Sequence, residues 1–252
     1  MLDGFTSREF AAPVDGRDVS HTVYERGDGP PVVVIQELPG IGQETLRLAA
    51  ELDNEGFRVV LPHLFGPLGR TSLLGNTVRV LCMRREFRLL EKRRSSPVIQ
   101  WLMALCRDVK DRTGAAGVGT IGMCLTGNFA ITLLADDAVL AGVASQPSMP
   151  IGRHEHLHMS DDEIVRVKAR LDDLPPARAL RFEGDPLCRE AKFDAYRDAF
   201  NSDGKERIRF TTLPGGGHSV LTLDFVDEAG HPTRAALDDA IGYLRDTLTT
   251  AL

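Results

Sequence analysis

The sequence contains few cysteines, and their spacing indicates neither a covalent framework nor a metal framework. The chain has four cysteines among its 252 residues, widely scattered and without a Cys-x-x-Cys pair. This spacing argues against a disulfide scaffold and against a zinc site. Free thiols are typical of a reducing compartment, so we expect a cytoplasmic protein.

Long apolar runs and an excess of positive charge are also missing. No stretch has the length needed to cross a bilayer, and the first residues lack the basic and apolar pattern of a secretory signal. The formal net charge of −6 argues against nucleic acid as the main partner. A hydrophobic content of 42% with 26% charged residues is that of an ordinary globular protein. We therefore expect neither a membrane nor a nucleic-acid partner.

Apolar strand patterns alternate with helical periodicity along most of the chain. A β-branched run at 31–36, a helical pattern at 43–55 and a second run at 57–61 form a strand–helix–strand unit, which implies parallel pairing. Further strands are expected at 117–121, 139–145, 179–183 and 208–213, and further helices at 97–114, from 129, 160–171, 189–200 and 233–248. The first 30 residues indicate an irregular or hairpin lead-in. This order predicts a single α/β domain over residues 1–252, with a mostly parallel, doubly wound sheet and helices on both faces.

A sharp turn between a strand and a helix is expected at Cys124. A strand–turn–helix with small residues around one nucleophilic side chain is the nucleophile elbow of α/β-hydrolases, in which serine is commoner than cysteine. Gly122 removes a Cβ atom where strand and helix approach each other. The second residue after the nucleophile is Thr126 instead of the usual glycine, and Gly127 follows it. The alternative interpretation is a buried structural cysteine in a βα unit.

Three residues suited to nucleophilic catalysis follow expected strands in the order nucleophile, acid, histidine. Cys124, Asp185 and His218 would meet where the carboxyl ends of parallel strands gather. An adjacent imidazole can take the proton of a thiol, and a carboxylate can orient that imidazole. Taken singly, Asp185 fits a turn and His218 fits a surface loop, so the prediction depends on their joint placement. The backbone N–H groups of Leu38 and Leu125 are expected to bind the oxyanion.

Residues 63–95 are the least regular part of the chain, and their second half is basic. The segment fits a lid or a substrate-binding insertion that offers Arg84 or Arg85 to an anionic substrate. A solvated helix face is the alternative interpretation of such a charge run. The alternating histidines at 154–158 have no matching Cys or His cluster, so we expect a loop beside the pocket and no metal.

Several motifs together carry a resemblance to a known family: Gln36–Gly40, the turn at Pro62, Gly122–Gly127, Asp185 and Gly217–Ser219. From Val32 to the final helix the chain resembles the dienelactone hydrolase family of α/β-hydrolases. The resemblance implies a triad of Cys124, His218 and Asp185 and no cofactor. It also implies that Glu37 lies beside the resting thiol and keeps it protonated until substrate displaces it.

The chain departs from this family after the catalytic histidine. Members that act on dienelactone carry an arginine a few residues beyond it, whereas here the residues after His218 are Ser, Val, Leu and Thr. Dienelactone itself is therefore left open as a substrate.

The expected function is cofactor-independent hydrolysis of carboxylic esters or lactones through an acyl-enzyme on Cys124. A thioesterase or acyltransferase would use the same residues with a different acceptor. A protein that binds a small ligand on a hydrolase scaffold, without turnover, is a further alternative. The expected partner is a small-molecule ester or lactone, and the expected assembly is a monomer or a homodimer.

Overall fold

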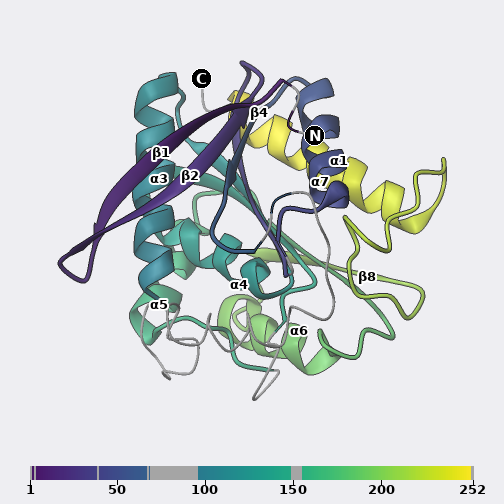
Figure 1. Ribbon diagram of the computed structural model, residues 1–252. Helices are drawn as coiled ribbons and strands as arrows, with labels where there is room; N and C mark the ends of the chain where they lie inside the picture. The colour runs from purple at the N-terminus through teal and green to yellow at the C-terminus, as the bar shows by residue number, and fades with distance from the viewer. Residues whose placement is uncertain are drawn as a thin grey trace.

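The centre of the structure is an eight-stranded sheet with helices on both faces (Figure 1). The computed structural model describes residues 2, 4–38, 40–66, 68, 96–148 and 155–250. The strands are β1 (Thr6–Val14), β2 (Arg17–Arg26), β3 (Pro31–Ile35), β4 (Arg58–Pro62), β5 (Val118–Met123), β6 (Val139–Ser145), β7 (Ala177–Phe182) and β8 (Ile208–Leu213). They are ordered β1-β2-β4-β3-β5-β6-β7-β8, and every pairing from β4 to β8 is parallel. Only β1 and β2 run antiparallel to their neighbours among these strands. The predicted mostly parallel sheet is confirmed.

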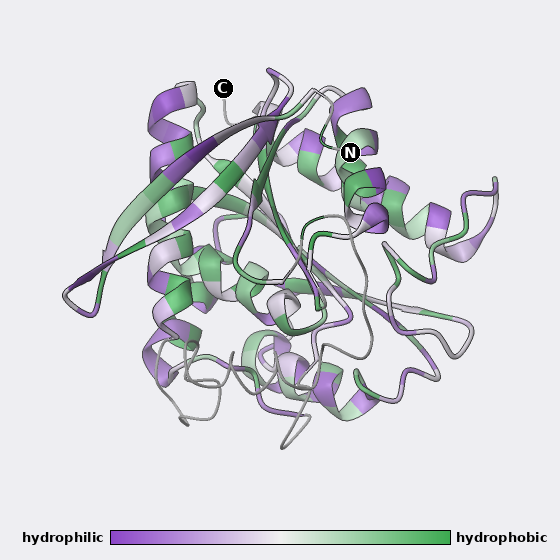
Figure 2. Cartoon of the chain, in the orientation of Figure 1, coloured by the Kyte–Doolittle hydropathy of each residue, from purple (hydrophilic) through white to green (hydrophobic). Residues whose placement is uncertain are grey.

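Helices divide the core into two apolar layers, one on each face of the sheet. The described helices are α1 (Gln43–Asn54), α3 (Pro97–Thr113), α4 (Leu125–Thr132), α5 (Asp161–Arg170), α6 (Glu190–Tyr196) and α7 (Pro232–Thr250), with short turns at Leu133–Ala135 and Arg197–Asn201. One layer lies beneath α1 and α7, and the other beneath α3, α4, α5 and α6. Figure 2 shows hydrophobic residues along the central strands and both kinds of residue on the surrounding helices. Strands covered on both faces are expected to be continuously apolar, as β3 is; β5 is also buried throughout, with Thr120 as its one polar residue.

Helix ends follow the local signals in the sequence. Ser160 caps α5: its hydroxyl accepts the N–H of Glu163 at 3.2 Å, and the Glu163 carboxylate accepts the N–H of Ser160 at 2.7 Å. Gly114 ends α3 in the left-handed conformation, with φ of 67°. The helix expected at 189–200 differs, because its last turn widens into a π-turn at Arg197–Asn201. This turn lets the Asn201 side chain donate to the carbonyl of Ile208 at 2.8 Å, at the start of β8.

The proposed lid falls largely outside the described residues. Of the segment 63–95, the structure describes 63–66 and 68, so the lid stays a prediction. None of the described helices combines the length and apolar character needed to cross a membrane.

A buried lysine in α6 makes stability depend on pH. Lys192 has no exposed surface, and its Nζ donates to the backbone carbonyl of His156. No carboxylate of the described residues forms an ion pair with it. Burial therefore lowers its pKa from 10.5 to about 7. Between these values the unfolded chain binds more protons than the folded one, so stability rises as pH rises from about 7 to 10.5.

We expect Lys192→Met to raise the melting temperature at pH 7 and to remove much of this rise with pH. One pKa unit corresponds to about 1.4 kcal/mol, so the gain at pH 7 should exceed about 1 kcal/mol. Thermal unfolding between pH 6 and 10 measures it. Lys205→Met, at a half-exposed lysine, is the control and should leave the slope unchanged. Parallel curves for the parent and Lys192→Met would contradict the interpretation.

Candidate active site

Five strands end in loops that form one polar centre at the carboxyl edge of the sheet. The loops after β3, β5, β6, β7 and β8 carry Glu37, Cys124, Ser148, Asp185 and His218 respectively. All five side chains are buried or partly buried. The structure therefore gathers the predicted nucleophile, acid and histidine at the edge where parallel α/β sheets place their ligand sites.

Cys124 occupies a strained turn between β5 and α4. Its φ of 57° and ψ of −124° are sparsely populated by non-glycine residues. Three backbone hydrogen bonds hold the turn. The Cys124 N–H donates to the carbonyl of Ser145, and its own carbonyl accepts the N–H groups of Gly127 and Ser148, each at 3.1 Å. This is the sharp turn that the spacing of the sequence predicts.

Glycines at two positions let the chain approach itself closely around this turn. A Cβ atom on Gly122 would lie 2.0 Å from the carbonyl oxygen of Thr126. A Cβ atom on Gly127 would lie 3.0 Å from Cα of Pro147, in the loop after β6. Glycine is therefore needed at Gly122, and at Gly127 a side chain would press against the loop after β6.

Thr126 connects the elbow to the end of β3. Its buried hydroxyl accepts the N–H of Met123 at 3.0 Å. The same oxygen lies 2.9 Å from the carbonyl oxygen of Met123, 3.0 Å from that of Ile35 and 3.1 Å from that of Gln36, and its single proton can donate to one of these three. A glycine at this position could make none of these bonds. The departure noted in the sequence thus fixes the segment that precedes Glu37 and Leu38.

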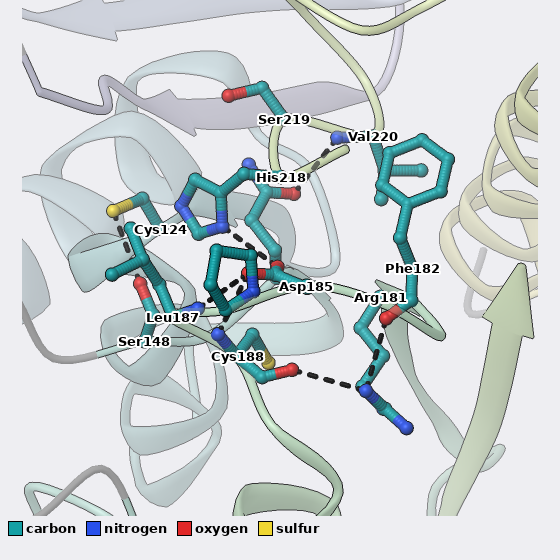
Figure 3. A network of polar contacts seen from close by, with 12 residues as sticks. Cys124, Ser148, Arg181, Phe182, Asp185, Leu187, Cys188, His218, Ser219 and Val220 are labelled. Atoms are coloured by element: carbon teal, nitrogen blue, oxygen red, sulfur yellow. Dashed lines mark hydrogen bonds and ion pairs between the residues drawn. The ribbon is translucent and has the colours of Figure 1, made fainter. Parts of the chain in front are cut away.

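The histidine and the acid are in direct contact. Nδ1 of His218 lies 2.7 Å from Oδ2 of Asp185. The other carboxylate oxygen of Asp185 accepts the backbone N–H groups of Leu187 at 2.8 Å and Cys188 at 3.0 Å. Figure 3 shows the imidazole between Asp185 and Cys124. Its Nε2 is buried and has no hydrogen-bond partner within the described chain. The ring thus leaves Nε2 free for the reacting groups.

The acid and histidine loops are held by two residues that the sequence did not single out. The Asp224 carboxylate accepts the N–H groups of His218 at 2.8 Å and Ser219 at 2.9 Å. Arg181 is buried, and its guanidinium donates to the carbonyls of Phe182 at 3.0 Å and Cys188 at 3.2 Å (Figure 3). A charged residue inside a buried strand was a usable signal for Arg181. Nothing in the local pattern distinguishes Asp224 from a surface turn residue.

The environment of His218 favours its protonated form. Burial lowers its pKa, but the hydrogen bond with the Asp185 carboxylate and the nearby Cys124 sulfur outweigh this and raise the pKa to about 10. At neutral pH the imidazole therefore carries protons on both nitrogens. One is directed to Asp185, and the other is available for transfer from Nε2.

Glu37 is buried at the end of β3, with partners that differ from those implied by the resemblance. Its carboxylate accepts hydrogen bonds from the hydroxyls of Thr222 and Ser219, the latter at 3.2 Å, and from the amide of Gln146 at 3.4 Å. Burial raises its pKa, and the bonds from Thr222 and Ser219 oppose the rise. None of these bonds reaches Cys124. Two of the three hydrogen bonds of Glu37 thus run to the loop after His218, and none of them runs to the thiol.

The two expected oxyanion donors lie at the same edge. Leu125 is the first residue of α4, so its N–H has no acceptor inside the helix. The N–H of Leu38 donates to no acceptor of the described residues. Both groups remain available to a ligand oxygen.

The remaining site predictions fall partly outside the described residues. Arg84 and Arg85, the predicted substrate-binding arginines, are not described. Where the chain is described, no three His, Cys, Asp or Glu side chains gather as a metal would require.

Solved structures share this architecture over almost the whole chain. A cold-adapted esterase from an Arctic intertidal metagenomic library matches with a TM-score of 0.62 at 16% identity, covering 98% of this chain and 95% of that chain. Carboxyl esterase 2 from the fungus Tuber melanosporum matches with a TM-score of 0.58 at 14% identity, covering 97% and 88%. The protein has the α/β-hydrolase fold, as predicted.

Sequence comparison narrows this class to one family. The model of the dienelactone hydrolase family matches residues 20–199. A carboxymethylenebutenolidase from Rhodococcus opacus is 26% identical over 232 residues, covering 87% of this chain and 81% of that protein. This chain belongs to the dienelactone hydrolase family, and it is a hydrolase of ester bonds.

We expect Thr126→Val to cost about 1–3 kcal/mol, because the buried N–H of Met123 loses its acceptor. The end of β3 should also loosen, so kcat/KM should fall roughly tenfold, about 1.4 kcal/mol of transition-state stabilisation. Urea unfolding and ester hydrolysis measure the two effects. The matched control is Thr132→Val, which removes a buried hydroxyl that bonds only within α4, to Asn128. Equal losses in the two variants would contradict a special role for Thr126.

Proposed function

We propose that the protein hydrolyses carboxylic esters or lactones through a Cys124–His218–Asp185 triad. The Cys124 sulfur attacks the carbonyl carbon, and the resulting oxyanion is bound by the N–H groups of Leu38 and Leu125. His218 gives its Nε2 proton to the leaving alkoxide, so that a thioester remains on Cys124. A water molecule then attacks the thioester with His218 as general base. The carboxylic acid leaves, and the sulfur is restored.

The observation that carries this proposal is the 2.7 Å contact between His218 and Asp185, with the imidazole lying between Asp185 and Cys124 and its Nε2 without a partner among the described residues (Figure 3). A buried carboxylate at this position fixes the orientation of the ring and stabilises the imidazolium. The strained turn keeps the sulfur at the start of α4, where backbone N–H groups point toward a bound carbonyl oxygen. The oriented imidazole and the backbone N–H groups at the start of α4 thus both serve a reaction at the Cys124 sulfur.

We include Glu37 in the site through its contacts with the histidine loop. Its bonds to Ser219 and Thr222 hold that loop against the end of β3. In the role that the family resemblance implies, Glu37 accepts the proton of the resting thiol. For that role its carboxylate would have to give up Ser219 and Thr222 and bond to Cys124.

The class of substrate is a small ester or lactone. The Rhodococcus opacus relative is a carboxymethylenebutenolidase, and its name describes cleavage of a cyclic ester. Because no arginine follows His218 closely here, the residues that would bind a substrate carboxylate differ. Hydrolysis of thioesters or acyl transfer would proceed through the same acyl-enzyme, and the acceptor would distinguish them.

The first test traps the acyl-enzyme. Brief exposure to a p-nitrophenyl acylate should add the mass of one acyl group to the parent protein and none to Cys124→Ala. We expect this variant to lose at least about 10³-fold in kcat/KM, as other triad nucleophile variants do. Cys106→Ala, at a buried cysteine in α3, is the control and should still acquire the adduct. Full activity of Cys124→Ala on every substrate of the parent would overturn the proposal. Tight ligand binding without any product would favour the non-catalytic alternative.

Substrate charge tests the two predicted arginines. We propose that Arg84 or Arg85 meets an anionic group of the substrate. The double alanine variant should then raise KM for an anionic ester roughly tenfold, because it loses about one charge-assisted hydrogen bond to the substrate. KM for a neutral ester should stay unchanged. Steady-state kinetics on a matched pair of esters measures this. Unchanged KM for both substrates would count against the prediction.

A further inference from the structure

The Cys124 sulfur has a hydrogen-bonding partner that belongs to no predicted triad position. Sγ lies 3.2 Å from the hydroxyl oxygen of Ser148, in the loop after β6. Glu37, the partner implied by the family resemblance, is occupied by Thr222, Ser219 and Gln146. Figure 3 shows Ser148 and His218 on different sides of Cys124.

We propose that Ser148 is a further catalytic residue, whose hydroxyl donates a hydrogen bond to the Cys124 thiolate and increases its population. This inference rests on the proposed function, since it assigns a role in activating the same nucleophile. It concerns the state of the sulfur before substrate arrives.

The backbone of Ser148 is fixed at both ends. Its N–H donates to the carbonyl of Cys124 at 3.1 Å. Its carbonyl accepts the side-chain amide of Asn128 at 3.1 Å, and the oxygen of that amide accepts the hydroxyl of Tyr196 at 3.1 Å. Asn128 and Tyr196 are fully buried. The backbone that carries the Ser148 hydroxyl is thus held beside Cys124 by buried hydrogen bonds.

The Cys124 sulfur and the Ser148 hydroxyl oxygen are hydrogen-bonding partners. Ser148 is only 1% exposed, and its hydroxyl makes no other hydrogen bond to the described residues. A buried hydroxyl without a partner is costly, so the contact persists in either protonation state of the cysteine. With the neutral thiol, the S–H group donates to the serine oxygen. With the thiolate, the serine O–H donates to the charged sulfur.

The hydrogen bond from the serine O–H to the thiolate is stronger than the bond from the neutral S–H group to the serine oxygen, because its acceptor is charged. Hydrogen bonds to an ionised acceptor are roughly twice as strong as neutral ones, so Ser148 stabilises the thiolate more than the thiol. The thiolate is the reactive form of cysteine. Protonated His218 and Ser148 then bind the sulfur together. After attack on the carbonyl carbon, the sulfur loses its charge and this bond weakens, which leaves the hydroxyl beside the acyl group.

The test measures the thiolate directly and does not depend on ester cleavage. Cys124 is alkylated with iodoacetamide between pH 4 and 10, and intact and peptide mass spectrometry assign the site. In Ser148→Ala we expect the midpoint of the alkylation profile to rise by about one pH unit. At pH values below the midpoint, where the thiolate is the minor form, the alkylation rate and kcat/KM with an activated ester should both fall roughly tenfold, the equivalent of one pKa unit. KM should change less than kcat.

Two further variants separate this role from packing. Ser148→Thr keeps the hydroxyl and should retain a profile near that of the parent. Thr120→Val removes a buried hydroxyl from β5 that bonds to the carbonyls of Ala130 and Ala141 and not to Cys124, so it should leave the profile unchanged. If Ser148→Ala has lost its structure by circular dichroism, Ser148→Gly replaces it.

Superposed alkylation profiles of the parent and the variants without a hydroxyl would overturn this inference even if the protein cleaves esters. A shifted profile in a protein that cleaves no ester or lactone would support Ser148 and overturn the proposed function instead.

Discussion

At Cys124 the chain changes from strand to helix within a single residue, with φ of 57°. Such a conformation costs on the order of 1–3 kcal/mol for a residue with a side chain, so it persists only where the surroundings stabilise it. Here Ser145, Gly127 and Ser148 bond to the backbone of the turn, and Thr126 joins it to β3. The position of Cys124 is therefore a consequence of how β3, β5 and β6 pack, and the other residues of the candidate site are placed relative to it.

The acid and the histidine stand on separate loops, and each loop has its own internal support. Arg181 bonds to the carbonyls of the acid loop, and Asp224 bonds to the N–H groups of the histidine loop. Glu37 adds a bond between the histidine loop and the end of β3. Because each support is a charged group that makes at least two hydrogen bonds, and Arg181 and Glu37 are also buried, they hold their loops more firmly than neutral contacts would. The His218–Asp185 pair can therefore form before any substrate binds.

Membership of the dienelactone hydrolase family and the arrangement of the site agree on the chemistry of ester bonds. The departures from the family pattern concern two separate parts of the reaction. Thr126 bonds within the elbow, whereas the residues after His218 lack the arginine that the family resemblance links to a substrate carboxylate. The first departure concerns the turn that carries Cys124, and the second concerns the substrate group that the proposed site would bind. This separation explains how the family resemblance can predict the reaction class without predicting the substrate.

The sequence by itself determined the order of strands and helices, the elbow at Cys124 and the chain order of Cys124, Asp185 and His218. These features depend on local periodicity, on glycine and on capping residues, which act within a few positions of the chain. Only the tertiary structure decided that the sulfur meets Ser148, that Glu37 meets Thr222, and that Asp224 holds His218. The first two contacts join residues 24 and 185 positions apart, and Asp224 differs from other turn residues only through its place in the fold. Such contacts follow from how the loops pack together at the sheet edge, and no local pattern encodes that packing.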